Sequence, residues 1–254
     1  MKFFWIISGK RFKQYLIIFV ASFFAALIAF VEGKDLAVFN TKDGEPRAIY
    51  KAEAKGKKIA LTFDVSWGDK RIHEILDFLK KEKVKDVTFF LSGEWAERHP
   101  DIVEEIVKNG HEIGSLGYRY KSYTGMDADK VKRDILLAQE KIKEVSDQKT
   151  DLLRPPNGHF DKQVLKIAEK LDYTIVHWSI NTRDWKNPGP DKIAETVLSR
   201  ADSGDIVLLH ASDSVKHTTK ALETIVSELR KDGYQFVTVG ELIANTESKS
   251  KEIK

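Results

Sequence analysis

The feature that most constrains the fold is an apolar run, Ile59 to Phe63, that ends in one acid, Asp64, and is followed by a Ser-Trp-Gly turn. A continuous apolar run of this length is typical of a strand in a parallel sheet that is buried on both faces. Such a strand delivers the residue at its carboxyl end to the edge of the sheet, where α/β proteins form their sites. We therefore expect chemistry at Asp64.

Apolar, β-branched runs alternate with amphipathic stretches along the rest of the chain, which is typical of repeated βα units and a parallel sheet. The predicted strands span residues 58–63, 87–91, 111–115, 151–154, 173–178, 205–209 and 235–239. The predicted helices span residues 69–83, 94–109 with an interruption at Pro100, 128–146, 161–171, 191–201 and 216–232. Acids stand where helix N-caps are expected, at Asp101, Asp127, Asp161 and Asp191.

Polar side chains come directly after several of the predicted strands. They include Asp64, Arg154, Asn181 and His210. A barrel gathers the carboxyl ends of all its strands on one face, whereas an open sheet uses only the crevice where the strand order reverses. The sequence therefore favours a distorted α/β barrel of seven or eight (β/α) units over an open doubly wound sheet.

The composition excludes several classes of function. The chain of 254 residues has no cysteine, which rules out thiol catalysis, disulfides and thiolate zinc sites. Its formal net charge is only +3, with both signs abundant, so nothing indicates a surface for nucleic acid. We expect no nucleic-acid partner and a monomeric chain.

The N-terminal part predicts export. Residues 15–31 form an apolar run without a charge, near the lower length limit for crossing a bilayer. Basic residues precede the run, which orients its N-terminus toward the cytosol and the rest of the chain outside. The run then acts as a single transmembrane helix that anchors the protein. A secreted protein with a cleaved signal peptide is the alternative, because small residues lie near the end of the run at Ala25, Ala26 and Ala29.

These features divide the chain into four parts. The predicted parts are a membrane anchor or signal segment at 1–32, a polar linker at 33–47, a catalytic-type domain at 48–245 and a charged tail at 246–254. The linker has turn chemistry at Asp43-Gly44, and the tail has no hydrophobic periodicity. Only the domain at 48–245 is expected to form a core.

Short motifs within that domain fall in the order and spacing of a known family. They are Thr62-Phe-Asp64, Thr88-Phe-Phe-Leu91, Gly110-His-Glu-Ile-Gly114, Arg154-Pro-Pro-Asn-Gly158, Asp184-Trp185 and Leu208-Leu-His210. On these motifs the domain resembles the polysaccharide deacetylase family, the NodB homology domain of carbohydrate esterase family 4, and within it the sporulation-associated PdaB branch. The resemblance implies a distorted (β/α) barrel of the NodB type, removal of N-acetyl groups from cell-wall glycan such as peptidoglycan, and a link to sporulation.

The resemblance also implies site residues. Asp64 matches the catalytic base and His210 the catalytic acid. Arg154 matches the arginine that pairs with the base, and Asp184 is placed to orient the histidine. Contacts to the glycan are expected from Trp67, Tyr120, Pro156, Trp185 and Leu208, with the two indoles as walls on which sugar rings stack.

The family uses a divalent metal, usually zinc, but its ligand positions are altered in this sequence. An aspartate and two histidines of the family are replaced by Val65, Leu116 and Tyr120. Valine and leucine cannot coordinate a metal, and a neutral tyrosine is a poor ligand for zinc. We therefore predict no metal cofactor. A replacement site would need a third donor beside the base and the acid, such as Asp69 or His159.

Three functions stay open from the sequence. The first is a peptidoglycan N-deacetylase in which Asp64 and His210 act without a metal. Such an enzyme lacks the stabilisation of the transition state that a metal provides, which is on the order of several kcal/mol. An oxyanion donor would then be needed, and the Tyr120 phenol or a backbone N–H after Leu91 is a candidate. The second is a catalytically impaired glycan-binding or structural protein of the cell envelope. A membrane-tethered interaction protein that functions through its N-terminal segment is a third reading.

Overall fold

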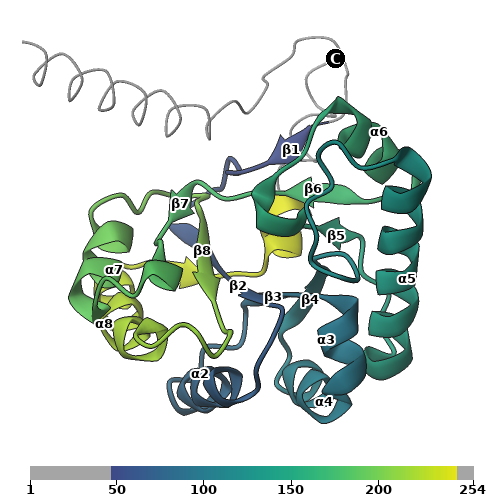
Figure 1. Ribbon diagram of the computed structural model, residues 1–254. Helices are drawn as coiled ribbons and strands as arrows, with labels where there is room; N and C mark the ends of the chain where they lie inside the picture. Colours follow the sequence, from purple (N-terminus) through teal and green to yellow (C-terminus); the bar gives the residue numbers. More distant parts are fainter. Residues whose placement is uncertain (1–46, 245–254) are drawn as a thin grey trace, which may run out of the picture. The chain divides into compact units, whose positions relative to one another are not determined.

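The computed structural model describes residues 47–244, in which one curled parallel sheet is covered on its outer face by helices (Figure 1). The strands are β1 (Ala48–Ile49), β2 (Lys58–Val65), β3 (Thr88–Leu91), β4 (Glu112–Ser115), β5 (Leu152–Leu153), β6 (Thr174–Val176), β7 (Ile180–Asn181), β8 (Ile206–His210) and β9 (Gln235–Phe236). The helices are α2 (Lys70–Lys81), α3 (Gly93–Arg98), α4 (Pro100–Lys108), α5 (Ala128–Ser146), α6 (Lys162–Lys170), α7 (Pro190–Leu198) and α8 (Thr218–Lys231). Two 3-10 turns, η2 (Pro156–Gly158) and η3 (Asp184–Lys186), follow β5 and β7.

The sheet is a curled half-barrel rather than a closed barrel. Its strand order is β1-β6-β5-β4-β3-β2-β8-β7, with β9 paired to the start of β2. No ladder joins the two ends, β1 and β7, within the described residues. The chain after β1 nevertheless crosses to β8, because Lys51 forms an antiparallel bridge with Asp205 and the Ala52 N–H donates to the Gly204 carbonyl at 2.9 Å. The predicted parallel (β/α) architecture is therefore confirmed, with an opening between the edge strands.

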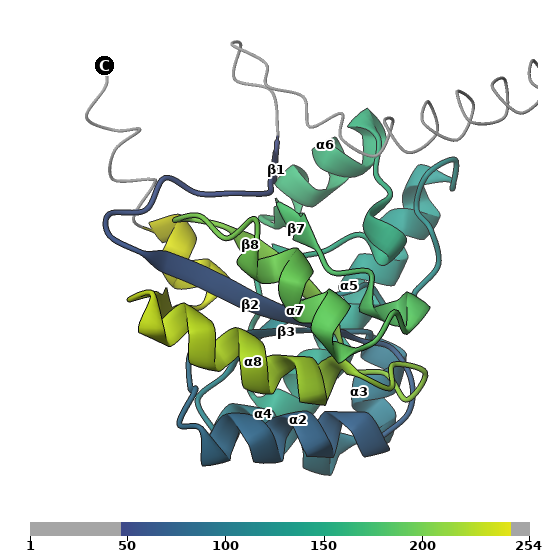
Figure 2. The ribbon, with the colours of Figure 1, turned by 90° about the vertical axis from the view of Figure 1, so that its left-hand side faces the viewer.

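β2 lies at the centre of this architecture, since it pairs with β3, β8 and β9. Successive side chains of a strand point to opposite faces. Leu61 and Phe63 join the core beneath the helices, whereas Ala60 joins a second cluster formed by the inner faces of the strands. Asp64 shares the inner face with Ala60. Helices α2 and α8 contact each other and lie side by side along β2 (Figure 2).

The elements largely confirm the predicted alternation, and the differences have local causes. The predicted helix over 94–109 is two helices, α3 and α4, because Pro100 has no N–H to continue the first and instead begins the second. Asp127 and Asp161 cap their helices by accepting from backbone N–H groups. The predicted caps at Asp101 and Asp191 are wrong, since each acid lies in the first turn behind a helix-initiating proline.

The predicted anchor or signal segment at 1–32, most of the linker at 33–47 and the charged tail at 246–254 lie outside the described residues. Between residues 47 and 244, no helix combines the length and apolar character needed to cross a bilayer. The transmembrane helix over residues 15–31 therefore stays a prediction.

Candidate active site

The Asp64 carboxylate is held by the Arg154 guanidinium. A guanidinium N–H of Arg154 donates to Asp64 Oδ1 at 2.7 Å, and the same nitrogen donates to the Thr62 hydroxyl at 2.9 Å. The other terminal nitrogen donates to the His177 carbonyl at 3.1 Å, and the guanidinium lies 4.0 Å from the centroid of the Phe90 ring. Asp64 is 5% exposed and Arg154 is fully buried. This is a buried, geometrically defined ion pair of the kind that fixes a carboxylate in place.

The curvature of the sheet makes this pair possible. Arg154 follows β5, and two strands, β4 and β3, separate β5 from β2 in the sheet. The Arg154 side chain therefore reaches Asp64 across the inner face of the half-barrel. Burial lowers the pKa of Arg154, while the charge of Asp64 and its hydrogen bond act in the opposite direction.

His210 and Asp184 form a second pair beside the first. His210 ends β8 and stands directly opposite Asp64 in the β2–β8 register. Its Nδ1–H donates to Asp184 Oδ1 at 2.7 Å, and its backbone N–H donates to Asp184 Oδ2 at 2.8 Å. The Thr218 hydroxyl and the backbone N–H of Trp185 also donate to Asp184, at 2.8 and 3.0 Å. The bond at Nδ1 fixes the ring orientation and leaves Nε2 as the nitrogen for proton exchange.

The pKa of the His210 imidazole is raised by its surroundings. Burial alone would lower the pKa of His210, but the hydrogen bond and charge of Asp184, together with the charge of Asp64, outweigh that effect. The positive charge of Arg154 acts against the increase. A histidine with a raised pKa holds its proton more firmly and suits the role of an acid. The structure thus brings the four predicted catalytic residues together at one edge of the sheet.

The residues at the family's metal positions do not fit a metal. Val65 is buried in the core beneath the helices, and Leu116 is buried among the inner faces of the strands. Burial and the nearby charge of Asp64 raise the pKa of Tyr120, so its phenol stays neutral. Among residues 47–244 there is no group of three or more histidine, aspartate or glutamate side chains that could hold a metal ion, and Asp69 and His159 complete none. Neither hydrocarbon side chain offers a donor atom.

The residues expected to contact glycan lie at different depths. Trp67 and Trp185 are the exposed ones, at 53% and 51%. Tyr120 is half-buried, and Pro156 and Leu208 are buried. Two indoles that stay exposed after the strand ends suit stacking on sugar rings, since an indole face in water gains by being covered. A glycan contact at any of these five residues stays a prediction.

The loop that carries Trp67 is held firmly. The Trp95 indole N–H donates to the Gly68 carbonyl at 2.7 Å. The Asp213 carboxylate accepts from the first backbone N–H groups of α2, those of Lys70 and Arg71, at 2.9 and 3.0 Å. Gly68 has a φ of +80°, and a Cβ there would lie 2.4 Å from Asp213, so only glycine fits this turn. Trp67 is therefore presented by a rigid turn.

Several residues of the site were not identified from the sequence. Thr62 bonds Arg154, and its signal was available, because residues two apart on a strand share a face. Thr218 bonds Asp184 from the start of α8, and no sequence pattern indicates that contact. Trp178 lies 5.6 Å from the Arg154 guanidinium and stacks on His177 with ring centroids 3.8 Å apart.

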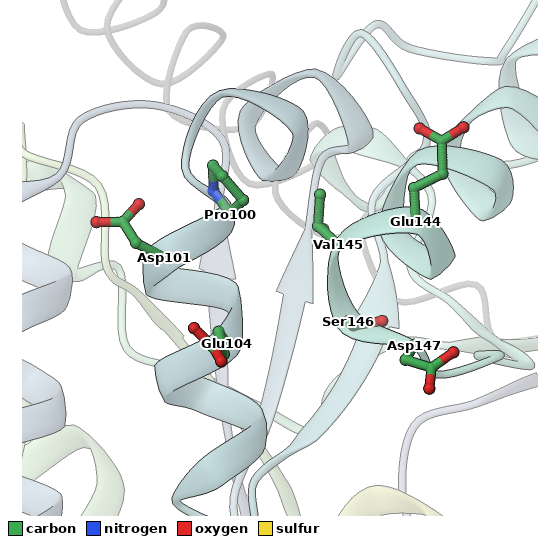
Figure 3. Close-up of a pocket in the computed structure, with 7 residues that line it drawn as sticks. All are labelled: Pro100, Asp101, Glu104, Glu144, Val145, Ser146 and Asp147. Carbon is green, nitrogen blue, oxygen red and sulfur yellow. The ribbon is translucent and has the colours of Figure 1, made fainter.

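A separate surface hollow lies in the helical layer, between the start of α4 and the end of α5 (Figure 3). Its volume is about 600 Å³. It is lined by Pro100, Asp101, Glu104, Glu144, Val145, Ser146 and Asp147. None of these residues belongs to the site around Asp64.

A parallel half-barrel with a paired aspartate and a paired histidine at its carboxyl edge has the architecture of the NodB-type fold. Residues 51–176 match the polysaccharide deacetylase family. The chain is 38% identical over 190 residues to a peptidoglycan-N-acetylglucosamine deacetylase of Bacillus cereus, which covers 74% of this chain and 88% of that protein. This chain belongs to the polysaccharide deacetylase family. The PdaB branch within the family stays a prediction.

Other relatives show what the family includes. The chain is 31% identical over 202 residues to the uncharacterised protein YlxY of Bacillus subtilis, which covers 80% of this chain but only 62% of YlxY. The structure of wild-type BA3943 from Bacillus anthracis, a CE4 family pseudoenzyme, matches with a TM-score of 0.73 and 32% identity, over 79% of this chain and 70% of that one. A BA3943 mutant with restored enzymatic activity matches equally well, at 0.73. The family's deacetylases hydrolyse N-acetyl amide bonds, and the same fold also serves a pseudoenzyme.

Proposed function

We propose that this protein binds N-acetylated cell-wall glycan at the edge formed by the ends of β2 and β8, and that it has lost metal-dependent deacetylation. The observation that carries the proposal is the filling of the three metal positions by Val65, Leu116 and a neutral Tyr120. The exposed indoles of Trp67 and Trp185 support retention of a glycan surface. The match to a deacetylase of peptidoglycan and to a pseudoenzyme of the same family fits both halves of the proposal.

A metal-independent N-deacetylase is the second candidate, and the intact pairs Asp64–Arg154 and His210–Asp184 favour it. In that reaction Asp64 would take a proton from the water that attacks the acetyl carbonyl carbon. The C–N bond would then break as His210 gives its proton to the leaving amine, which yields acetate and a free amino sugar. A general base and a general acid each increase the reaction rate by roughly 10²- to 10⁴-fold. Without a metal, the oxyanion lacks the stabilisation that a Lewis acid provides, which is on the order of several kcal/mol.

The test measures binding and turnover on the same sample. The full-length chain, held in a nonionic detergent, is mixed with N-acetylated peptidoglycan fragments, and released acetate is followed with EDTA, with added zinc and in Asp64→Asn. Binding without acetate supports the proposed function. Acetate release that resists EDTA and is lost in Asp64→Asn supports the second candidate. Acetate release that EDTA abolishes would contradict the conclusion that the site excludes a metal, and absence of binding would end the glycan proposal.

We also propose a setting for this activity. The charge pattern around residues 15–31 supports a membrane anchor with the domain outside the cytosol, and a cleaved signal peptide is the alternative. The resemblance to the PdaB branch supports a role in sporulating cells. The mass of the mature protein in membrane and medium fractions distinguishes anchor from cleavage, and spore yield in a deletion strain tests the sporulation link. Size-exclusion chromatography tests the predicted monomer.

A further inference from the structure

We propose that Tyr120 makes this site a reader of the N-acetyl group: its phenol O–H donates a hydrogen bond to the acetamide carbonyl oxygen of an intact N-acetylated sugar. The inference rests on the proposed glycan binding. It adds the chemical group that is recognised and the residue that recognises it. It also predicts that a de-N-acetylated sugar is disfavoured, because that sugar has no carbonyl acceptor.

The position of Tyr120 is the first support. Its ring packs against the inner cluster that contains Phe90 and Leu116. Phe90 stands opposite Asp64 in the β2–β3 register and carries the Arg154 guanidinium over its ring. Tyr120 therefore shares a wall with the Asp64–Arg154 pair, and its side chain is half-buried rather than sealed in the core.

The backbone supports the same conclusion independently. Tyr120 has a φ of +51°, in the left-handed region that is unfavourable for a residue with a side chain. Such a conformation persists only where the surrounding structure holds it, and it clusters at functional sites. The preceding residues provide the hold, since the Tyr118 N–H donates to Asp134 at 2.8 Å and the Tyr118 hydroxyl donates to Glu97 at 3.0 Å. The strained turn thus directs Tyr118 outward and Tyr120 inward.

The chemistry matches an amide. A tyrosine hydroxyl is neutral at pH 7 and can both donate and accept. The backbone of Asn157 donates toward the phenol oxygen, which leaves the phenol hydrogen for an acceptor on the ligand. An ionised carboxylate only accepts, so Asp64 suits the N–H of the same acetamide. A donor and an acceptor side by side are what an amide requires for its C=O and N–H.

An ammonium group fits this site less well. A de-N-acetylated sugar presents a cation with donors only. The charge of Asp64 is already matched by Arg154 at 2.7 Å, and the Asp184 pair favours the protonated form of His210 nearby. Because each carboxylate is already paired with a cation, neither offers an unmatched negative charge to an ammonium group. The site therefore discriminates by hydrogen bonding and by charge in the same direction.

The test compares two ligands that differ only in acetylation. Full-length protein in nonionic detergent is titrated by calorimetry with a chitooligosaccharide and with the fully de-N-acetylated oligomer of the same length. We expect tighter binding of the acetylated ligand, and Tyr120→Phe lowers that affinity about three- to tenfold, the range for one neutral hydrogen bond. The affinity for the de-N-acetylated ligand stays unchanged in this variant.

Tyr50→Phe is the matched control, because Tyr50 is an exposed tyrosine next to β1. It should leave both affinities unchanged, and equal melting temperatures for the variants exclude a folding defect. Equal affinity for the two ligands, or equal losses for both in Tyr120→Phe, would overturn the acetyl-reading role while leaving glycan binding in place. No binding of either ligand would instead remove the proposed function itself.

Discussion

Asp64 and Glu112 are both carboxylates on strands of one parallel sheet, yet they lie at opposite edges and have different partners. Asp64 lies near the carboxyl end of β2 and is paired with the cation Arg154 at 2.7 Å. Glu112 begins β4 and accepts only from neutral donors, the Thr88 hydroxyl at 2.7 Å and the Gly240 N–H at 3.0 Å. With no cation beside it, burial raises the pKa of Glu112. The two buried carboxylates thus differ in their partners, a guanidinium for Asp64 and neutral donors for Glu112.

The two edges differ in the same way. Glu112 binds the start of the helical residues 239–244, whose side chains Val239 and Leu242 fill the inner cluster at the amino end of the strands. That edge is closed by apolar packing. The carboxyl edge instead carries a half-buried phenol, a histidine and exposed indoles. One edge stabilises the half-barrel, and the other presents chemistry to solvent.

Arg154→Ala gives the largest expected effect, because it removes the cation that distinguishes Asp64 from Glu112. It leaves Asp64 as an unpaired buried charge, which lowers the free energy of unfolding by about 3–5 kcal/mol. Urea denaturation followed by circular dichroism measures the loss. Arg98→Ala is the control, since Arg98 pairs with Glu94 on the surface at 3.7 Å, and its loss should be below about 1 kcal/mol. Similar losses in both variants would contradict the assignment of a structural ion pair.

Asp184→Asn tests the second pair at the carboxyl edge. Because the folded pKa of His210 is raised above 6.5, its stabilising contribution is present below pH 6.5 and is lost as the pH rises through the folded value. The slope is at most ~1.4 kcal/mol per pH unit for one proton. The variant removes the charge that raises the pKa, so the pKa of His210 should fall in an NMR titration and the slope should disappear. Thr218→Val keeps the His210–Asp184 bond and is expected to change the pKa less; an unchanged pKa in Asp184→Asn would refute the pairing.

Glu112→Gln tests the amino edge and should change the pH dependence of stability by a smaller amount. Here the cause is a buried carboxylate without a cation beside it, rather than an ion pair. The folded pKa of Glu112 is raised above 4.5, so its contribution is present below pH 4.5 and is lost as the pH rises through the folded value. Glutamine keeps an oxygen that can accept from the Gly240 N–H, and it does not ionise. Between pH 4.5 and 7 the variant should therefore lose less stability than the wild type, by on the order of 1 kcal/mol. Parallel stability curves for the two proteins would show that Glu112 is not titrating in this range.

Trp67→Ala gives the smallest expected change in stability, because the indole is exposed. The free energy of unfolding should change by no more than about 0.5 kcal/mol, while glycan affinity falls about three- to tenfold through the loss of an aromatic platform. Leu136→Ala, at another exposed apolar residue, should change neither quantity. A stability loss without an affinity loss would show that Trp67 belongs to the scaffold rather than to the glycan surface.

The sequence predicted those parts of the fold that long patterns encode. β2 and α5 carry many residues of one periodicity, and α5 begins and ends where it was predicted. β1 and β7, each two residues long, were missed, whereas β5 and β9, of the same length, fell within predicted strands. The break in the helix at Pro100 was predicted, since a single residue type causes it.

The residues of the candidate site also fall into those that the sequence predicted and those that it did not. Asp64 and His210 were predictable because each lies at the end of a recognisable apolar strand, and motif order supplied Arg154 and Asp184. The contact of Thr218 with Asp184 joins elements whose packing no local pattern contains. The left-handed backbone of Tyr120 was equally hidden, because tyrosine gives no signal for a positive φ.

The pairing of β1 with β6 has a mechanical consequence. Ala48 pairs with Ile175, so the first strand of the described domain docks only after most of the sheet has been synthesised. Contacts between residues so distant along the chain form slowly. Tension applied to the chain ahead of Ala48 would reach the short β1–β6 ladder and the Lys51–Asp205 bridge before it reached β2. This edge would detach first, and the strand that carries Asp64 would keep its pairing with β3 and β8.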